Sequence, residues 1–359
     1  MKAAVCRAFG APLVIEELDL APPGPGEIRV KIAACAICHS DIHYADGEWG
    51  GNLPAVYGHE AAGVVEETGP GVSTLQPGDH VVVTLIRSCG HCHYCTQGKL
   101  FSCETTFPLD EKSPLSAADG SPIVHGLRTG TFAEYAVVEE SQAVAIPGDV
   151  PLDSASLLAC GVITGLGAVV NTAEMRPGAN VVVIGAGGVG LNSVQGAAIG
   201  GARTIVAVDI VESKLEAAKR FGATHAVDGR DADAAERIGA LTDGRGADYV
   251  FVTVGAKAAF DQAFGFLAGA GALVVVGMPP SGVMAGYEPN DFAYKGQRIL
   301  GSSMGSSRIQ VDIPWLVSLY KQGRLKLDEL ISGRYPLHEI NEAIASTRSG
   351  EALRNVIVF

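Results

Sequence analysis

A glycine-rich turn between an apolar strand and a helix constrains the fold of this chain most strongly. The segment VVVIGAGGVGLNSVQGAAIGG contains the pattern G-x-G-x-x-G directly after an apolar run, and its positions are Gly185, Gly187, Gly188, Val189 and Gly190. The next apolar run, TIVAVDI, contains Asp209 near its end, and SKLEAAKRFGA follows with helical character. This order predicts a βαβ unit whose backbone N–H groups, at the start of the helix, can bind a dinucleotide pyrophosphate.

Asp209 predicts which dinucleotide the turn would bind. A carboxylate at the end of the second strand can accept hydrogen bonds from the adenosine ribose and would repel a 2′-phosphate. We therefore expect NAD rather than NADP. Lys214 could also reach the ribose, although a solvated helix lysine explains its position equally well. The glycines could serve only tight packing, but the strand–turn–helix context favours a cofactor.

Apolar runs alternate with helical segments from about residue 162 to 303. The runs are 225–228, 248–254, 272–278 and 298–303, and helices such as 258–270 lie between them. Unbroken β-branched runs alternating with helices predict an α/β unit with a doubly wound parallel sheet, covered on both faces. We place a Rossmann-like domain at residues 162–303.

The rest of the chain predicts a different unit. The segments 14–20, 27–35, 63–69 and 79–85 are strand-like and are separated by Pro, Gly and Asp turns, which favours an antiparallel, barrel-like domain. Residues 304–359 supply helices at 314–323 and 339–350 and a last strand, and we expect them to pack on this first domain. No secretory signal or unbroken apolar span is visible, so we expect a cytoplasmic protein.

Four of the eight cysteines lie close together in one lobe, at Cys89, Cys92, Cys95 and Cys103. In the cytoplasm, cysteines at this spacing more commonly bind metal than form disulfides. Four thiolates complete a tetrahedral zinc shell without an open position, so we predict a structural zinc site in the lobe 89–103. Unrelated thiols and an iron–sulfur cluster are the alternatives. Two histidines of the lobe could compete as ligands, but we expect both to face solvent.

A second motif, Cys35-Ala-Ile-Cys38-His39, admits several interpretations. Its C-x-x-C-H spacing fits c-type haem attachment, and its two cysteines fit a redox pair. Such haem belongs to exported proteins, and redox C-x-x-C pairs usually lie near a βαβ pattern, which is absent at this point. Taken singly, Cys38, His59 and Cys160 are most simply a buried thiol or a core histidine.

The whole chain resembles the zinc-dependent medium-chain alcohol dehydrogenases. The segments that carry the resemblance are CHSD with His43, GHE at 58–60, the lobe 89–103, Cys160-Gly161, the turn 185–190 with Asp209, and the closing LRNVIVF. The resemblance implies a GroES-like catalytic domain, formed by residues 1–161 and 304–359, and a Rossmann coenzyme domain formed by residues 162–303.

The resemblance also implies NAD and two zinc ions per chain as cofactors. The catalytic zinc would be bound by Cys38, His59 and Cys160, which leaves a fourth position for water or substrate. Zinc would stabilise the alkoxide while hydride moves to the nicotinamide. The proton would leave through the hydroxyl of Ser40, the nicotinamide ribose and His43.

Further residues match positions around this centre. Glu60 would lie behind the zinc ligands, and Asp41 would accept the free ring N–H of His59. His39 and Arg354 match contacts to the cofactor pyrophosphate, although Arg354 could equally be a surface charge.

The pocket residues implied by the resemblance are Trp49 and Leu85, with residues near 126–128, and they suggest an apolar, partly narrowed channel. Relatives that oxidise glutathione–formaldehyde adducts carry an acidic residue where Trp49 stands, which counts against that substrate. Arg87 and Arg128 could hold a carboxylate or sulfonate, but arginines at such positions are more often simply exposed.

We therefore expect reversible hydride transfer between NAD and an alcohol, primary and either aliphatic or aromatic. A relative specialised for a thiol adduct, a polyol or an acid-bearing alcohol is the second interpretation. The third is a non-catalytic zinc- and NAD-binding redox sensor, against which the open zinc shell and the proton relay argue. The expected partners are a small alcohol or aldehyde and further copies of the chain, as a dimer or tetramer. The net charge of −13 disfavours nucleic acid.

Overall fold

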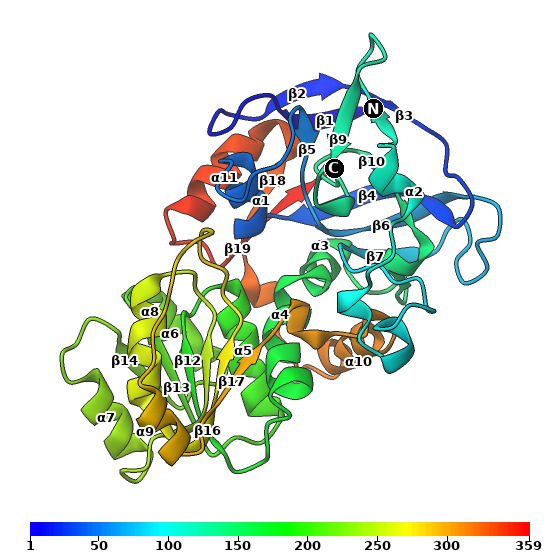
Figure 1. Ribbon diagram of the computed structural model, residues 1–359. Helices are drawn as coiled ribbons and strands as arrows, with labels where there is room; N and C mark the ends of the chain where they lie inside the picture. Colours follow the sequence, from blue (N-terminus) through cyan, green and yellow to red (C-terminus); the bar gives the residue numbers. More distant parts are fainter. The chain divides into compact units, whose positions relative to one another are not determined.

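The computed structural model describes all 359 residues, and they form two compact units (Figure 1). Unit 1 comprises residues Met1–Cys160 and Arg308–Phe359, and unit 2 comprises Gly161–Ser307. No single helix is long and apolar enough to cross a membrane, and one bent pair, Leu152–Ala159 with Gly161–Thr172, meets that test by length and composition alone.

Unit 1 contains two sheets of mainly antiparallel strands. The first has the order β2-β1-β5-β9-β8-β3, and the second has the order β11-β7-β6-β4-β19-β18, with β10 also paired to β4. The strands of the first sheet are β1 (Lys2–Cys6), β2 (Val14–Glu17), β3 (Asp19–Leu20), β5 (Ala55–Val56), β8 (Leu115–Ser116) and β9 (Pro122–His125). Those of the second are β4 (Glu27–Ala36), β6 (Glu60–Thr68), β7 (His80–Thr84), β10 (Tyr135–Glu139), β11 (Ala143–Ala145), β18 (Ile331–Pro336) and β19 (Arg354–Val358). The strands predicted at 27–35, 63–69 and 79–85 correspond to β4, β6 and β7, whereas the segment 14–20, predicted as one strand, divides into β2 and β3, which pair with different strands.

Strand β4 organises unit 1 because three other strands pair with it. Register shifts at Arg29/Val30 and Ile32/Ala34 mark irregularities at which the strand can bend. At its carboxyl end, Ala36 pairs with Glu60 of β6 on one side and with Val356 of β19 on the other. The end of β4 is therefore the point at which three distant parts of the sequence meet.

Short helices complete unit 1. They are α1 (His39–Ala45), α2 (Pro108–Glu111), α3 (Leu152–Ser156), α10 (Ile309–Lys321) and α11 (Ile340–Arg348), with 3₁₀ turns η3 (Gly126–Arg128) and η5 (Leu157–Ala159) among the connections. The helices predicted at 314–323 and 339–350 correspond to α10 and α11. Helix α10 begins earlier than predicted, so that Pro314 lies inside it rather than at its start.

Unit 2 is a six-stranded parallel sheet with helices around it (Figure 1). The strand order is β14-β13-β12-β15-β16-β17, so the order reverses at β12, where ligands bind in doubly wound sheets. The strands are β12 (Asn180–Ile184), β13 (Thr204–Asp209), β14 (His225–Asp228), β15 (Ala247–Val252), β16 (Leu267–Val275) and β17 (Arg298–Gly301). The helices are α4 (Gly161–Gly167), α5 (Gly188–Ile199), α6 (Glu212–Arg220), α7 (Ala234–Leu241), α8 (Lys257–Ala263) and α9 (Pro289–Tyr294). The predicted doubly wound sheet is confirmed.

One predicted helix of unit 2 extends too far. The segment 258–270 was expected to be helical throughout, but α8 ends at Ala263 and β16 already begins at Leu267. Leu267 pairs with Ala247 of β15, and a register shift precedes the next pair, Tyr249 with Ala272. Ala270, with φ of +58°, lies within this irregularity. Strand pairing thus outweighs the helical character of the sequence.

Candidate active site

Cys38, His59 and Cys160 are far apart in the sequence but lie together in unit 1. Cys38 follows the end of β4 and His59 precedes β6, and these two strands pair at Ala36 and Glu60. Cys160 follows η5, which packs against β6. All three side chains are buried. One ligand atom from each, with a carboxylate oxygen of Glu60, lies within 4.8 Å of the others.

Asp41, in the first turn of α1, holds two of these residues at once. Its buried Oδ1 accepts hydrogen bonds from the Gly58 N–H and from His59 Nδ1, both at 2.9 Å. Its Oδ2 accepts the N–H of Cys38 at 3.0 Å. Gly58 has φ of +92°, and a Cβ there would lie 2.5 Å from the backbone nitrogen of Phe132, so this position requires glycine. Because a carboxylate only accepts, His59 carries its proton on Nδ1, and Nε2 is left to face the thiols.

The protonation of the cluster suits a bound cation. A hydrogen bond from the thiol of Cys160 holds the pKa of Cys38 well below its usual value despite burial, and the same bond raises the pKa of Cys160. Nε2 of His59 is buried and makes no well-aligned hydrogen bond. Two sulfurs and an imidazole nitrogen are ligands that zinc prefers, and binding would displace the remaining thiol proton. The residues present therefore fit a zinc ion with an open position.

Glu60 and Arg354 form a buried ion pair beside these ligands. Arg354 begins β19, whose pairing with β4 brings it to the same end of the sheet, and its Nη2 contacts Glu60 Oε1. Burial raises the pKa of Glu60 to about 7, and the positive charge of Arg354 opposes the rise. The alternative interpretation of Arg354 as a surface charge was therefore wrong. Its contact with a pyrophosphate stays a prediction, as does that of His39, which is exposed at the start of α1.

Ser40 and His43 lie one turn apart on α1, so their side chains share a face of the helix. Ser40 is half-buried, and the side chain of His43 is 24% exposed. His43 Nδ1 contacts the Glu48 carboxylate, and its ring stacks on Trp49 with 4.7 Å between centroids. Glu48 was not recognised in the sequence. The signal that could have identified it is an acidic residue in the short loop that follows the helix of the histidine.

The predicted pocket residues are all placed in unit 1. Trp49 packs on His43 and, edge-on, on Tyr44, with 5.4 Å between the latter ring centroids. Leu85 follows β7 and is half-buried. The segment 126–128 forms η3. The structure therefore links Trp49 directly to the histidine of the proposed proton path, and the lining of a channel by Trp49 and Leu85 stays a prediction.

Arg87 is buried, which corrects the alternative that it is simply exposed. Its guanidinium pairs with Asp110 of α2 and lies over the ring of Phe107, 4.5 Å from the ring centroid. A buried arginine is tolerated where a carboxylate neutralises it and a ring covers it. Because the guanidinium of Arg87 already pairs with Asp110, Arg87 is poorly suited to bind an acidic substrate. Arg128 is exposed, as that alternative expected.

The glycine turn of unit 2 lies at the reversal point of the sheet. Gly185 has φ of +94°, and its carbonyl accepts a hydrogen bond from the hydroxyl of Thr253 at 2.9 Å. A Cβ on Gly190 would overlap the carbonyl oxygen of Gly185, so helix and turn pack without side chains between them. Gly187 caps α5, and no atom lies within 4 Å of the place a Cβ would take. The open helix N-terminus fits a pyrophosphate.

Asp209, at the end of β13, is tied to this turn. Its Oδ2 accepts the N–H of Ala186 at 2.6 Å, and its Oδ1 accepts those of Ile210 and Val211 at 2.8 and 3.0 Å. The carboxylate thus stands beside the glycine turn, as the sequence predicts for a ribose ligand. Lys214 lies half-buried in the first turn of α6, shortly after Asp209.

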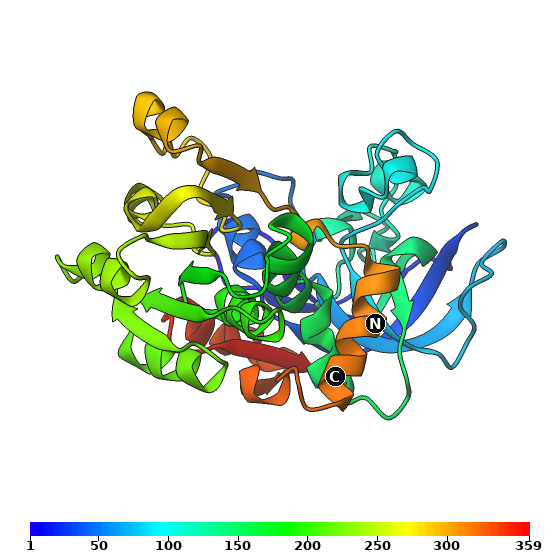
Figure 2. The same ribbon diagram turned by 90° about the horizontal axis from the view of Figure 1, so that it is seen from below.

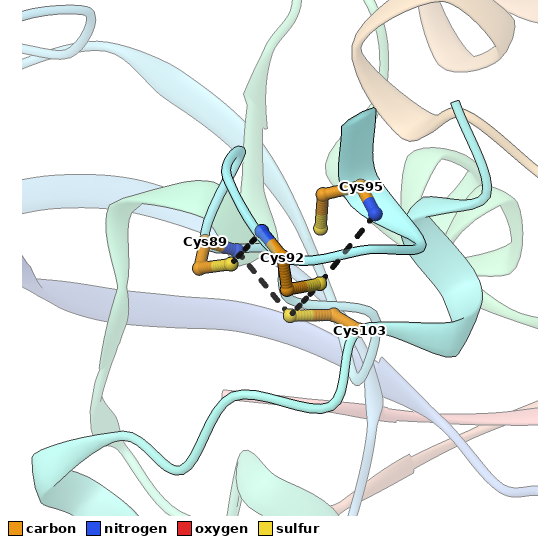
Figure 3. A group of neighbouring side chains, drawn as sticks. All are labelled: Cys89, Cys92, Cys95 and Cys103. Atoms are coloured by element: carbon orange, nitrogen blue, oxygen red, sulfur yellow. Dashed lines mark hydrogen bonds between the residues drawn. The ribbon is translucent and has the colours of Figure 1, made fainter. Parts of the chain in front are cut away.

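The four-cysteine lobe is also assembled, and its sulfur atoms lie within 4.8 Å of one another (Figure 3). Backbone N–H groups of Cys92 and Cys95 donate to the sulfurs of Cys89 and Cys92, at 3.3 and 3.5 Å. A hydrogen bond from the side chain of Thr105 is the main cause of the lowered pKa of Cys89, to which the N–H of Cys92 adds. The N–H of Cys95 is the main cause of the lowered pKa of Cys92. Four converging sulfurs with N–H···S bonds fit a closed zinc shell. The neighbouring histidines are exposed, as expected.

Comparisons with known proteins agree with this arrangement. Residues 24–148 match the model of the alcohol dehydrogenase GroES-like domain, and residues 188–322 match that of zinc-binding dehydrogenases. An NDMA-dependent alcohol dehydrogenase of Amycolatopsis methanolica is 39% identical, covering 99% of this chain and 98% of its own. An alcohol dehydrogenase zinc-binding domain protein of Burkholderia ambifaria has a TM-score of 0.95 at 40% identity, over 100% and 98% of the chains. Benzyl alcohol dehydrogenase of Acinetobacter calcoaceticus has a TM-score of 0.93 at 35% identity, over 100% and 99%.

Proposed function

The chain belongs to the zinc-dependent medium-chain alcohol dehydrogenases, and we propose that it interconverts primary alcohols and aldehydes with NAD, using Cys38, His59 and Cys160 as its catalytic zinc ligands. The family makes the protein an oxidoreductase that uses zinc and a nicotinamide dinucleotide on small alcohols or aldehydes. The assignment of residues is supported by one observation above all. Two thiols and an imidazole nitrogen converge in a buried cluster that a cation would complete.

The residues of unit 1 have distinct tasks in this proposal. Zinc, when bound, supplies a Lewis acid that makes the alcohol hydroxyl easier to deprotonate. Asp41 holds His59 in the tautomer that leaves Nε2 available as a ligand, and it holds the backbone of Cys38 at the same time. Glu60 balances its charge against Arg354, so this ion pair limits the negative charge beside the two thiolates.

The proton of the alcohol leaves along α1. Ser40 takes the hydroxyl proton as its own is passed on, and His43 receives the outgoing proton at Nε2. Because the side chain of His43 is partly exposed, it can release that proton to water. The two residues are three positions apart on α1 and therefore share one face of the helix.

Unit 2 would bind the cofactor through the glycine turn 185–190. The nicotinamide of bound NAD supplies the hydride acceptor. Gly187 leaves the start of α5 open for the pyrophosphate, and Asp209 accepts hydrogen bonds from the ribose, with Lys214 nearby. The family resemblance also predicts pyrophosphate contacts by His39 and Arg354. The negative charge of Asp209 supports NAD over NADP.

Three observations support an apolar, and in particular an aromatic, alcohol as substrate. Trp49 and Leu85 are apolar, Arg87 is neutralised by Asp110, and the chain is similar to a benzyl alcohol dehydrogenase. The test measures NADH formation from NAD with short aliphatic alcohols, benzyl alcohol, a polyol, a carboxylate-bearing alcohol, and formaldehyde with and without thiols. Turnover confined to the charged or thiol-linked compounds would overturn the substrate class. Two zinc ions per chain are expected by elemental analysis, one of them in the lobe 89–103.

We also propose that the protein is a homo-oligomer, a dimer or tetramer, that works in the reducing cytoplasm. Strand β17 has one unpaired edge, and beside it α9 projects from unit 2 (Figure 2). Exposed apolar side chains gather in this part of the sequence: Met284, Tyr287, Tyr294 and Ile299. Light scattering of the parent and of Ile299→Lys tests the oligomer, and a monomeric parent would refute it. None of the eight cysteines forms a disulfide, which favours a reducing compartment.

A further inference from the structure

We propose that Glu48 is a positioning residue of the proton path: it holds His43 in the tautomer that can accept a proton and stabilises the imidazolium that results. The inference rests on the proposed role of His43 in the reaction. It extends that role to a residue outside α1, in the loop that follows the helix.

The contact defines the tautomer of His43. Nδ1 of the ring meets Oε2 of Glu48, and the two atoms form an ion pair when the ring is protonated. An ionised carboxylate can only accept a hydrogen bond, so Nδ1 must carry the proton. Nε2 of the neutral ring is then unprotonated and is the atom that can take up a proton.

The loop after α1 is built to return the carboxylate to the ring. The N–H of Glu48 donates to the carbonyl of His43 at 3.0 Å, and that of Gly47 donates to the carbonyl of Tyr44 at 3.1 Å. Gly47 has φ of +79°, and a Cβ there would lie 2.8 Å from the ring of Phe9. The turn is therefore fixed by backbone bonds and by a position that requires glycine.

Trp49 restricts the ring from its face. Its side chain stacks on His43 with 4.7 Å between centroids and 26° between the planes, and Tyr44 packs on it edge-on. An indole face also favours a cation, so the stack adds to the stabilisation of imidazolium by the carboxylate. The His43 ring is thus held in two places, on one face by Trp49 and at Nδ1 by Glu48.

The other charged groups nearby are engaged elsewhere. Asp41, on the same helix, is bonded to His59 and to backbone N–H groups. Asp46 pairs with Arg348 of α11 at 2.7 Å. The hydroxyl of Tyr57 donates to a backbone carbonyl of α1. Glu48 is the one carboxylate that contacts His43.

The proton balance is simple. A proton taken up at Nε2 gives an imidazolium whose Nδ1–H remains on Glu48, so the pair is neutral overall. Loss of the Nε2 proton to water restores the neutral ring in the same tautomer. Glu48 keeps its charge throughout and is not itself a carrier, because its task is to orient the ring and to stabilise its charged form.

The test compares Glu48→Gln with Glu48→Asp, which keeps the charge, and with Asp46→Asn, which removes a carboxylate from the same loop that faces Arg348 instead. Two readouts are used. The first is the pH dependence of kcat for alcohol oxidation. The second is the fluorescence of Trp49 in protein without substrate, in a Trp315→Phe background, because the chain has only two tryptophans. A protonated imidazole stacked on indole quenches its emission, so the second readout follows His43 without any turnover.

We expect Glu48→Gln to move both the acidic limb of kcat and the fluorescence transition to lower pH by about half a unit or more, because imidazolium loses its partner. In Glu48→Asp and Asp46→Asn, the acidic limb of kcat and the fluorescence transition should both shift by less than this. His43→Gln should abolish the fluorescence transition and alter the acidic limb. Identical profiles for Glu48→Gln and the parent in both readouts would overturn the inference.

The outcomes separate this inference from the proposed function. If His43→Gln changes the kcat profile but Glu48→Gln does not, His43 keeps its role and Glu48 loses its own. If Glu48→Gln moves the fluorescence transition while His43→Gln leaves the kcat profile unchanged, His43 is not on the proton path. That result would overturn the proposed role of His43 and, with it, the inference.

Discussion

Replacing Asp41 by asparagine should weaken zinc binding at one site of the chain and leave the other site unchanged. Asp41 is buried and accepts three hydrogen bonds, from the N–H groups of Cys38 and Gly58 and from Nδ1 of His59. Asparagine has the same shape but only one acceptor oxygen. Asp41→Asn therefore tests whether this carboxylate organises the catalytic cluster.

The expected loss of zinc affinity can be estimated from the hydrogen bonds that asparagine cannot accept. If the asparagine oxygen keeps the hydrogen bonds from Gly58 and His59, its amide nitrogen faces the N–H of Cys38. Both groups are donors, so that hydrogen bond is lost. Loss of one hydrogen bond to a charged acceptor costs about 1.5–3 kcal/mol. Removal of a carboxylate behind a ligating histidine lowers metal affinity by roughly 10–100-fold, or about 1.4–2.8 kcal/mol. The two figures agree, so we expect a loss of zinc affinity in that range.

The assay is competition of the holoenzyme with a coloured zinc chelator. The parent should release two zinc ions per chain. Asp41→Asn should release one of them at a chelator concentration 10–100-fold lower, by the same reasoning on ligand positioning, and kcat should fall with it. The lobe 89–103 is the internal standard, because it lies on a different segment and its zinc should be unaffected.

A control variant distinguishes ligand positioning from a general loss of structure. Asp46→Asn removes a carboxylate just after the same helix, where it pairs with Arg348, and it should release zinc as the parent does. Equal weakening of both zinc sites in Asp41→Asn would indicate loosening of unit 1 as a whole. Unchanged release from both sites would refute the reasoning outright.

Four further predictions test other parts of the molecule. Cys160→Ala should abolish turnover and leave one zinc per chain while NAD still binds by fluorescence titration; unchanged activity would remove Cys160 from the zinc shell. Asp209→Gly should shift the ratio of kcat/KM for NADP over NAD upward by about tenfold or more, and an unmoved ratio would show that Asp209 does not contact the ribose. Cys95→Ala should lower the Tm before it lowers kcat, because its sulfur belongs to the closed shell. Burial raises the pKa of Glu139 to about 7. The folded state therefore favours the protonated carboxyl, and the stability that this form contributes at low pH is lost as the pH rises through 7. Glu139→Gln, which cannot ionise, should raise the Tm relative to the parent more at pH 8 than at pH 5.

Local patterns were the most predictable part of this protein. The glycine turn is recognisable because the strand, the turn and the helix are contiguous, and each glycine answers a steric requirement within a few residues. The lobe 89–103 is recognisable for the same reason, because its four cysteines come from one short segment. In both cases the residues that act together in space are also close together in the sequence.

Side-chain partners were less predictable. The pairing of Arg87 with Asp110 and of His43 with Glu48 depends on how loops return to the body of unit 1, and many acidic residues could have taken either place. The helix expected over 258–270 failed for a related reason. Its last residues have helical character locally, but pairing with β15 decides their conformation.

The catalytic cluster lies between these two cases. Its residue types could be predicted from the family resemblance, but their meeting depends on strand register. Ala36 pairs with both Glu60 and Val356 at the end of β4, and this pairing places Cys38 beside His59 and brings Arg354 to Glu60. Successive residues of a strand point to opposite faces, so a slip of one residue would turn Glu60 away from Arg354 and leave two buried charges unpaired. The large cost of that arrangement means that the ion pair favours the observed register, and through the register it favours the meeting of Cys38 and His59.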